Sequence, residues 1–96
     1  MATNLVFEQS PAQVLDWEVD WSTRGLGTDT IATSTWRGSS TDFTLSAASN
    51  ASTNTTIWLT GGVPGTTYYI TNTITTVGGR TMEETFPYVC LAEQTN

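Results

Sequence analysis

Alternation of apolar and acidic side chains is the strongest local pattern in the chain. Between residues 14 and 21, the odd positions hold Leu15, Trp17, Val19 and Trp21, and the even positions hold Asp16, Glu18 and Asp20. Successive side chains of a strand point to opposite faces of its sheet, so this period of two predicts a strand over residues 14–21. We expect its apolar face, with both tryptophans, to lie in the core and its acidic face to meet solvent.

Five further strands are predicted, at residues 30–36, 42–47, 55–60, 66–77 and 80–90, with Gly-, Ser- and Asn-rich turns between them. In the fourth predicted strand, Trp58 faces away from Ile57 and Leu59, either into a second layer or into solvent. Because Pro87 has no amide donor, the last strand must lie at a sheet edge or carry a bulge near that residue. Glu84 falls on the apolar side of this strand, so we expect it near a rim or beside a slip of register.

Regularly spaced strands without a convincing helix predict an all-β fold, a small antiparallel immunoglobulin-like β-sandwich of six to seven strands. The seventh strand would come from the N-terminal residues or from the loop around Arg24. Cys90 is the single cysteine, so the disulfide that joins the sheets of many such domains is missing. The expected organisation is an N-terminal arm at 1–13, the sandwich at 14–91 and a C-terminal tail at 92–96.

Charge narrows the range of partners. The chain of 96 residues has nine acidic residues, three arginines, no lysine and no histidine, for a formal net charge of -6. Such a surface repels phosphate backbones and anionic lipids, so neither nucleic acid nor a membrane is an expected partner. Residues 1–13 lack the basic and apolar regions of a signal peptide, which predicts synthesis in a cytoplasm without classical export.

The side-chain chemistry does not favour an enzyme. Without histidine there is no Ser–His or Cys–His nucleophile pair, and without lysine there is no Schiff base. Asp16, Glu18 and Asp20 would lie about 7 Å apart along one strand face. They could act as a glycosidase pair, bind calcium, or form a solvated face that protects an edge strand, and the last interpretation is favoured. In a functional variant of it, the acidic stripe meets a basic patch on a partner; no cofactor and no metal are expected.

Several stretches resemble a known family. Residues 16–21 (DWEVDW) followed by 26–36 (LGTDTIATSTW) resemble the opening of small tailed-phage virion proteins labelled phage fiber-tail adaptor proteins. Residues 57–62 (IWLTGG), 65–76 (GTTYYITNTITT) and 79–81 (GRT) match as well, so the resemblance covers roughly 14–86. The loop at 37–41 and the end after residue 86 depart from the family pattern. The resemblance implies a structural protein of the virion that forms a homo-oligomer in a symmetric assembly.

Three functions follow as hypotheses. The first is a non-enzymatic adaptor that joins tail or neck components to fibre components, with an arm that inserts into a neighbouring subunit. The second is a capsid decoration (cement) protein on the outer capsid surface, and the third is a carbohydrate-binding or host-adhesion module that uses Trp58 and the Tyr68–Tyr69 pair. The candidate partner-binding residues are Leu5, Val6, Phe7, Asp16, Glu18, Asp20 and Trp58. The expected partners are other virion proteins, namely tail, neck, fibre or capsid subunits.

Overall fold

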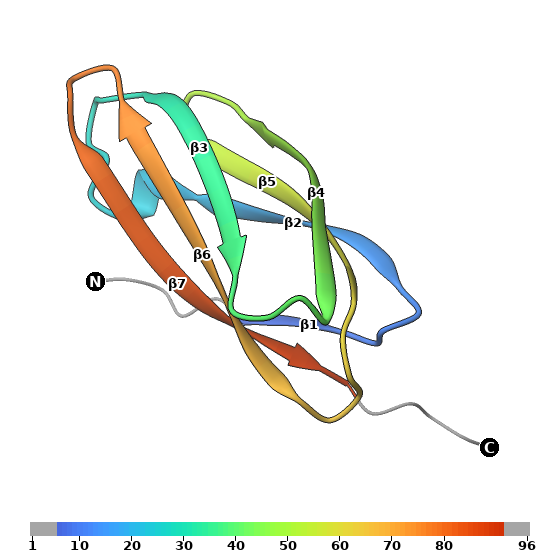
Figure 1. The fold of residues 1–96 in the computed structure, drawn as a ribbon. Coiled ribbons are helices and arrows are strands. Elements are labelled where there is room, and N and C mark those ends of the chain that lie inside the picture. The colour runs from blue at the N-terminus through green and yellow to red at the C-terminus, as the bar shows by residue number, and fades with distance from the viewer. Residues whose placement is uncertain (1–5, 92–96) are drawn as a thin grey trace.

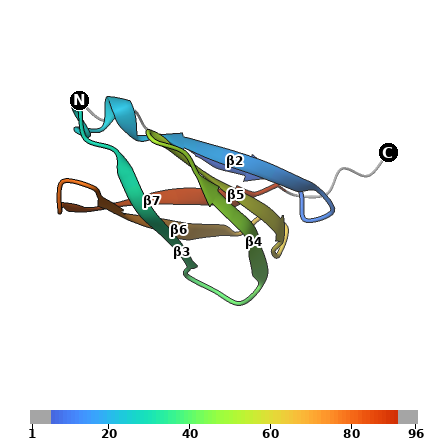
Figure 2. The same cartoon turned by 90° about the horizontal axis from the view of Figure 1, so that it is seen from above.

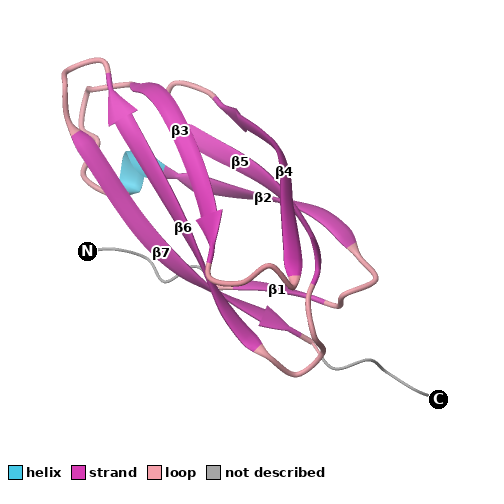
Figure 3. Cartoon of the chain, viewed as in Figure 1, coloured by secondary structure: helices cyan, strands magenta, loops and turns pink. Residues whose placement is uncertain are grey.

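Seven strands form two sheets that pack face to face. The computed structural model describes residues 6–91. The elements are β1 (Phe7–Gln9), β2 (Val14–Asp20), the 3-10 helix η1 (Trp21–Thr23), β3 (Ile31–Gly38), β4 (Phe43–Asn50), β5 (Asn54–Gly61), β6 (Thr67–Thr76) and β7 (Thr81–Cys90). One sheet has the strand order β1-β7-β6-β3 and the other β2-β5-β4 (Figures 1 and 2). Figure 3 shows that most of the described chain lies in strands.

The strand order is that of an immunoglobulin-like sandwich. β2-β5-β4 corresponds to strands B, E and D of that fold, and β7-β6-β3 to strands G, F and C. A further hallmark is the tyrosine near the start of strand F, where the hydroxyl of Tyr68 accepts a hydrogen bond from the amide of Val63 at 2.9 Å. The predicted fold class is therefore confirmed, with one correction: β1 pairs with β7 in parallel, because it lies beside the last strand of the chain.

The six predicted strands are present, and their ends shift for local reasons. β2 stops at Asp20 because its carboxylate accepts a hydrogen bond from the amide of Ser22 at 3.0 Å and so caps η1. β4 continues to Asn50 through a bulge between Ser46 and Ser49, where Ala47 has a φ of 50°. A bulge inserts an extra residue into one strand, which alternation of side chains does not reveal.

Within the described residues, the predicted N-terminal arm is not separate from the sandwich but supplies its seventh strand, one of the two sources that we expected. Residues 7–9 are β1, and they complete the four-stranded sheet. Phe7 is fully buried and stacks on Trp17 and Phe86, with ring centroids 5.1 and 5.6 Å apart. The buried side chain of Gln9 donates from Nε2 to the carbonyl of Leu59 at 2.8 Å, which ties β1 to the opposite sheet. Leu5 and the predicted tail at 92–96 lie outside the described residues.

A buried polar network joins the two sheets through the centre of the core. Asn72 of β6 is fully buried, and its Oδ1 accepts from the indole of Trp21 at 2.9 Å and from the hydroxyl of Thr55 at 2.7 Å. Its Nδ2 donates to the hydroxyl of Ser34 and to the carbonyl of Thr35, both at 2.9 Å. One amide thus connects β5 and η1 on one side with β3 on the other, and the indole donor of a buried tryptophan is satisfied.

Pro87 is accommodated at an edge, without a bulge. The register between β6 and β7 is continuous through Pro87, which lies opposite Tyr69. The amide of Cys90 donates to Thr66 at 2.9 Å, whereas that of Leu91 donates to Gln9 on the other side, so odd-numbered residues of β7 direct their backbone groups away from β6. The missing donor of Pro87 therefore faces the outer edge, where no ladder bond is lost.

Glu84 remains on the inner side of β7, near its edge. A guanidinium nitrogen of Arg24 lies 3.4 Å from its carboxylate, and the Arg24 side chain is only 5% exposed. The same guanidinium lies over the ring of Phe86, 5.1 Å from the centroid. A rim position is thus confirmed for Glu84, whereas the register slips elsewhere, in β3 and β4.

We expect Asn72→Ala to lower the free energy of unfolding by about 3 kcal/mol, because it leaves the Trp21 indole without its main acceptor inside the core. Urea denaturation followed by tryptophan fluorescence measures this change. Asn50→Ala, at an exposed position of β4, is the matched control and should change it by less than about 0.5 kcal/mol. Equal effects for the two variants would show that the network does not stabilise the sandwich.

Phe7→Ala should cost about 3–5 kcal/mol, as expected for a fully buried aromatic side chain between two stacked rings. Val6→Ala, at a neighbouring residue that is 39% exposed, should cost much less. Thermal unfolding monitored by circular dichroism compares the two. A Phe7→Ala protein as stable as the wild type would contradict the placement of β1 in the core.

Candidate partner-binding face

The structure brings four of the predicted binding residues onto one surface. In the register between β2 and β5, Asp16 lies opposite Trp58 and Glu18 opposite Thr56. Directly opposed residues project from the same face of a sheet. Trp58 is 38% exposed while Ile57 and Leu59 are buried, so this face is the outer one. We call the outer surface formed by Asp16, Glu18, Asp20 and Trp58 the acidic face.

The cross-strand neighbours of Trp58 on this face are Asp16 and a short hydroxyl side chain, and an exposed apolar residue lies further along β2. Ser46 of β4 lies opposite Trp58 on its second side, and Val14, which is 59% exposed, lies opposite Thr60. The exposure of Trp58 answers the question that the sequence left open, since the ring faces solvent and not a second layer. A large aromatic ring between a carboxylate and a short hydroxyl side chain offers both apolar contact area and charge to a partner.

The three arginines form ion pairs with carboxylates, so the net negative charge lies on the acidic residues outside these pairs. Arg24, Arg37 and Arg80 lie 3.4, 3.3 and 3.2 Å from carboxylates of Glu84, Glu83 and Asp29, respectively. Within residues 6–91, the acidic residues outside these ion pairs are Glu8, Asp16, Glu18, Asp20 and Asp42. Three of these five are on the acidic face.

The members of the acidic face differ in their local contacts. Asp20 accepts hydrogen bonds from the hydroxyl of Ser22 at 2.6 Å and from the Ser22 amide at 3.0 Å, and these bonds lower the pKa of Asp20. Asp16 and Glu18 form no ion pair within the described part of the chain, and both are exposed. Their charge is therefore available to a partner, whereas Asp20 also caps η1.

The carboxylates of the acidic face do not form a metal site in the described part of the chain. Among residues 6–91, no three His, Cys, Asp or Glu side chains are placed so that they could hold a metal ion. The carboxylates follow one another along a single strand, and such a row does not surround an ion. The same described residues contain no helix of the length and hydrophobicity needed to cross a membrane.

Other predicted binding residues lie elsewhere. Phe7 is in the core, and Val6 is exposed just before β1. Tyr68 is buried and Tyr69 is 54% exposed, because neighbours in a strand point to opposite faces. Tyr69 projects from the outer face of the four-stranded sheet, on the opposite side of the sandwich from Trp58. The Tyr68–Tyr69 pair is thus no aromatic platform, and Tyr69 does not lie on the acidic face.

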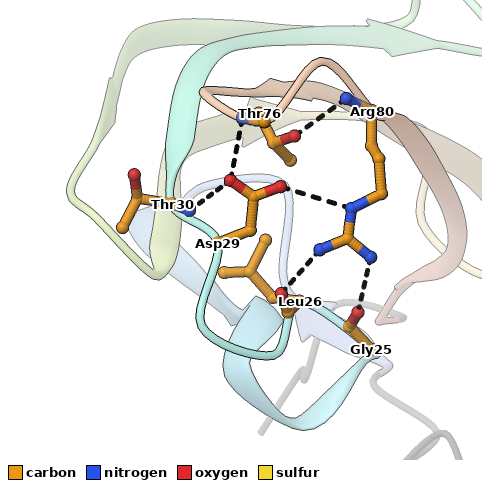
Figure 4. A network of polar contacts seen from close by, with 7 residues as sticks. Gly25, Leu26, Asp29, Thr30, Thr76 and Arg80 are labelled. Carbon is orange, nitrogen blue, oxygen red and sulfur yellow. Dashed lines mark hydrogen bonds and ion pairs between the residues drawn. The ribbon is translucent and has the colours of Figure 1, made fainter.

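Two stretches that carry the family resemblance meet at one end of the sandwich. Asp29 accepts from the amides of Thr30 and Gly78, both at 2.9 Å, and from Nε of Arg80 at 3.2 Å (Figure 4). Nη2 of Arg80 donates to the carbonyl of Leu26 at 2.9 Å. These contacts fasten the loop after η1 to the β6–β7 hairpin, a structural role that our sequence reasoning did not assign to either residue. The sequence offered one signal for this contact: Asp29 and Arg80 both lie in stretches that carry the family resemblance, 26–36 and 79–81.

Hydrogen bonds from the Thr76 hydroxyl, the Gly78 and Thr30 amides and the Arg80 guanidinium lower the pKa of Asp29 to about 2, although burial opposes the shift. The carboxylate of Asp29 therefore stabilises the fold above the unfolded pKa of 3.8, and this contribution is lost as the pH falls from about 4 to 2. We expect Asp29→Asn to be less stable than the wild type at neutral pH, with a difference that shrinks across this range. Urea denaturation at several pH values measures it, and Asp16→Asn is the exposed control. A difference independent of pH would contradict the assignment.

Comparison with known proteins identifies a family whose sequence model covers most of the chain. A sequence model of a family described as podophage GP4 fiber-tail adaptor protein gp77 matches residues 9–88. No individual curated protein matches the chain. The matched range begins at Gln9, the buried residue of β1, and ends at Tyr88 in β7, so it includes the acidic face, Asn72 and the contact between Asp29 and Arg80. Because the match spans most of the 96 residues, the chain belongs to the family of podophage GP4 fiber-tail adaptor proteins.

Proposed function

We propose that this protein is a non-enzymatic structural component of a bacteriophage virion that joins tail or neck components to fibre components. Membership of the fiber-tail adaptor family supports this role. Hydrogen bonds of Asn72, and of Gln9 in β1, hold the two sheets together, and such a rigid sandwich is suited to connecting other proteins. Tail, neck or fibre proteins are the proposed partners, and neither nucleic acid nor a membrane is among them because the net charge is -6.

One observation carries the proposal for the contact surface: carboxylates without ion pairs lie beside an exposed tryptophan on a single strand-built face. Charge of one sign on a rigid surface attracts and orients a partner of the opposite sign. Tryptophan is enriched among the residues that dominate binding energy at protein interfaces. The partner proposed for the acidic face is therefore a basic surface of a tail or fibre protein.

The assembly that we propose is a ring of identical copies in the virion, built from protein made in the host cytoplasm. Symmetric repetition lets contacts that are weak in one copy add up to a tight joint. Leu5 and Val6, which precede β1, are candidates for contact with a neighbouring copy. Phe7 is buried, so it would support such a contact only indirectly, by holding β1 in place.

The number of copies per virion tests the adaptor role. Quantitative mass spectrometry of purified particles should give a ratio to the major capsid protein that corresponds to a small ring. A ratio near one per capsid subunit or capsomer would instead support a capsid decoration protein and overturn the adaptor role.

Variants of the acidic face test where the partner binds. In phage that carry Trp58→Ala, we expect incorporation of this protein into virions to fall by about tenfold or more, as for loss of a binding hot spot. Tyr69→Ala removes an exposed aromatic ring from the opposite sheet and is the matched control, with incorporation expected at the wild-type level. Normal incorporation of Trp58→Ala, together with loss of binding to host polysaccharide, would favour the host-adhesion function.

A further inference from the structure

The exposed edges of the two sheets differ in how they are protected against pairing with another strand. β1 has three residues, and β7 carries Pro87 beside it. The register of β4 is broken between Ser46 and Ser49, and that of β3 between Ile31 and Thr33. These are common means of blocking strand addition. β2 has an unbroken register over its seven residues and contains no proline.

Backbone groups of β2 are directed to its open side. The amide of Trp21 donates to Thr53 at 2.8 Å, which continues the β2–β5 register beyond the end of the strand. In an antiparallel pair, residues alternate between facing the partner strand and facing away from it. Asp16 and Glu18 therefore direct their N–H and C=O groups away from β5. Asp20 also faces away from β5, but its carbonyl already accepts a hydrogen bond from the hydroxyl of Thr23.

The core is incompletely covered along the same edge. Leu15 is on the inner side of β2, opposite the fully buried Leu59, and yet it is 36% exposed. Trp17, two residues further on, is also only partly buried. A further strand beside β2 would cover both side chains, so the edge offers apolar contact as well as backbone groups that pair with no other strand of the described residues.

We propose that the open edge of β2 accepts an extended segment of the partner as an additional strand, and that this segment alternates basic with apolar residues. The proposal rests on the adaptor function and specifies its partner. Outward side chains of the added strand would lie about 5 Å from Asp16 and Glu18, where Lys or Arg is favoured. Inward side chains would lie against Leu15 and Trp17, where apolar residues are favoured. The edge of a second copy is disfavoured, because it would set carboxylates against carboxylates.

A capped peptide of sequence Thr-Lys-Val-Lys-Val-Lys-Thr serves as the probe, added to the full-length ¹⁵N-labelled protein. Amide hydrogen exchange is followed by NMR. With nine-tenths of the protein bound, exchange at Asp16 and Glu18 should slow about tenfold, because their amides become hydrogen-bonded. Amides of β2 that already face β5, such as that of Trp17, should change little.

Matched reagents separate strand addition from simple charge attraction. A peptide with the same side chains but N-methylated along its backbone should lose binding. Asp16→Asn combined with Glu18→Gln should weaken binding of the parent peptide about tenfold, as expected for two cross-strand charge pairs, and Glu8→Gln should not. Absence of binding, or binding that survives N-methylation without slower exchange at Asp16 and Glu18, would overturn the proposal.

Failure of this inference is distinct from failure of the adaptor role. A low copy number in virions together with no response to the peptide would leave the adaptor role in place and reject strand addition. A copy number equal to that of capsid subunits, together with slowed exchange at Asp16 and Glu18, would confirm the binding edge and reject the adaptor role.

Discussion

The amide of Asn72 is the contact on which the arrangement of the two sheets depends. It is the meeting point of β3, β5, β6 and η1, and every one of its polar atoms is engaged with a group from another element. A buried polar group is costly unless it is fully satisfied, so only one relative placement of the sheets accommodates it. Apolar packing alone would tolerate small shifts between the sheets. The network therefore fixes the sheets, and with them the register of the strands that carry the outer faces.

The second constraint is electrostatic. Each arginine holds a carboxylate of β7 or of the loop before β3, and these pairs keep the four-stranded sheet and its loops close to neutral. Asp16 and Glu18 of β2 form no ion pair with an arginine of the described residues, although β2 is the edge strand with the most regular backbone. Charge thus replaces bulges and prolines as the protection of this edge. Protection by charge excludes like-charged strands and admits basic ones.

The sequence predicted the strands and the acidic face because both follow from alternation, which is local. Val14 to Asp20 shows the pattern without interruption, and the face that it predicted is the one observed. The exposure of Trp58 could not be read from the chain, since it depends on whether another layer covers β5. The burial of Phe7 could not be predicted from the sequence either. A short apolar run looks the same whether it packs on its own sheet or on a neighbour.

Alternation of apolar and polar residues also does not predict polar contacts between distant parts of the chain. Asn72 interrupts an apolar face, and nothing near it in the chain reveals that Trp21 supplies the hydrogen bond. Asp29 and Arg80 are 51 residues apart and meet only because the loop after η1 returns to the β6–β7 hairpin (Figure 4). Such contacts depend on how the strands are arranged in space. The sequence predicted the fold class but not the order of the strands in each sheet.

Zero-length coupling of carboxylates to amines in intact virions, read by mass spectrometry, tests the central claim most directly. The chain has no lysine, so apart from its N-terminal amine every link from its carboxylates must lead to a different protein. We expect links from Asp16 and Glu18 to lysines of a tail, neck or fibre protein. Links confined to Glu8, Asp42 or Glu83, or links from β2 to the major capsid protein, would contradict the account.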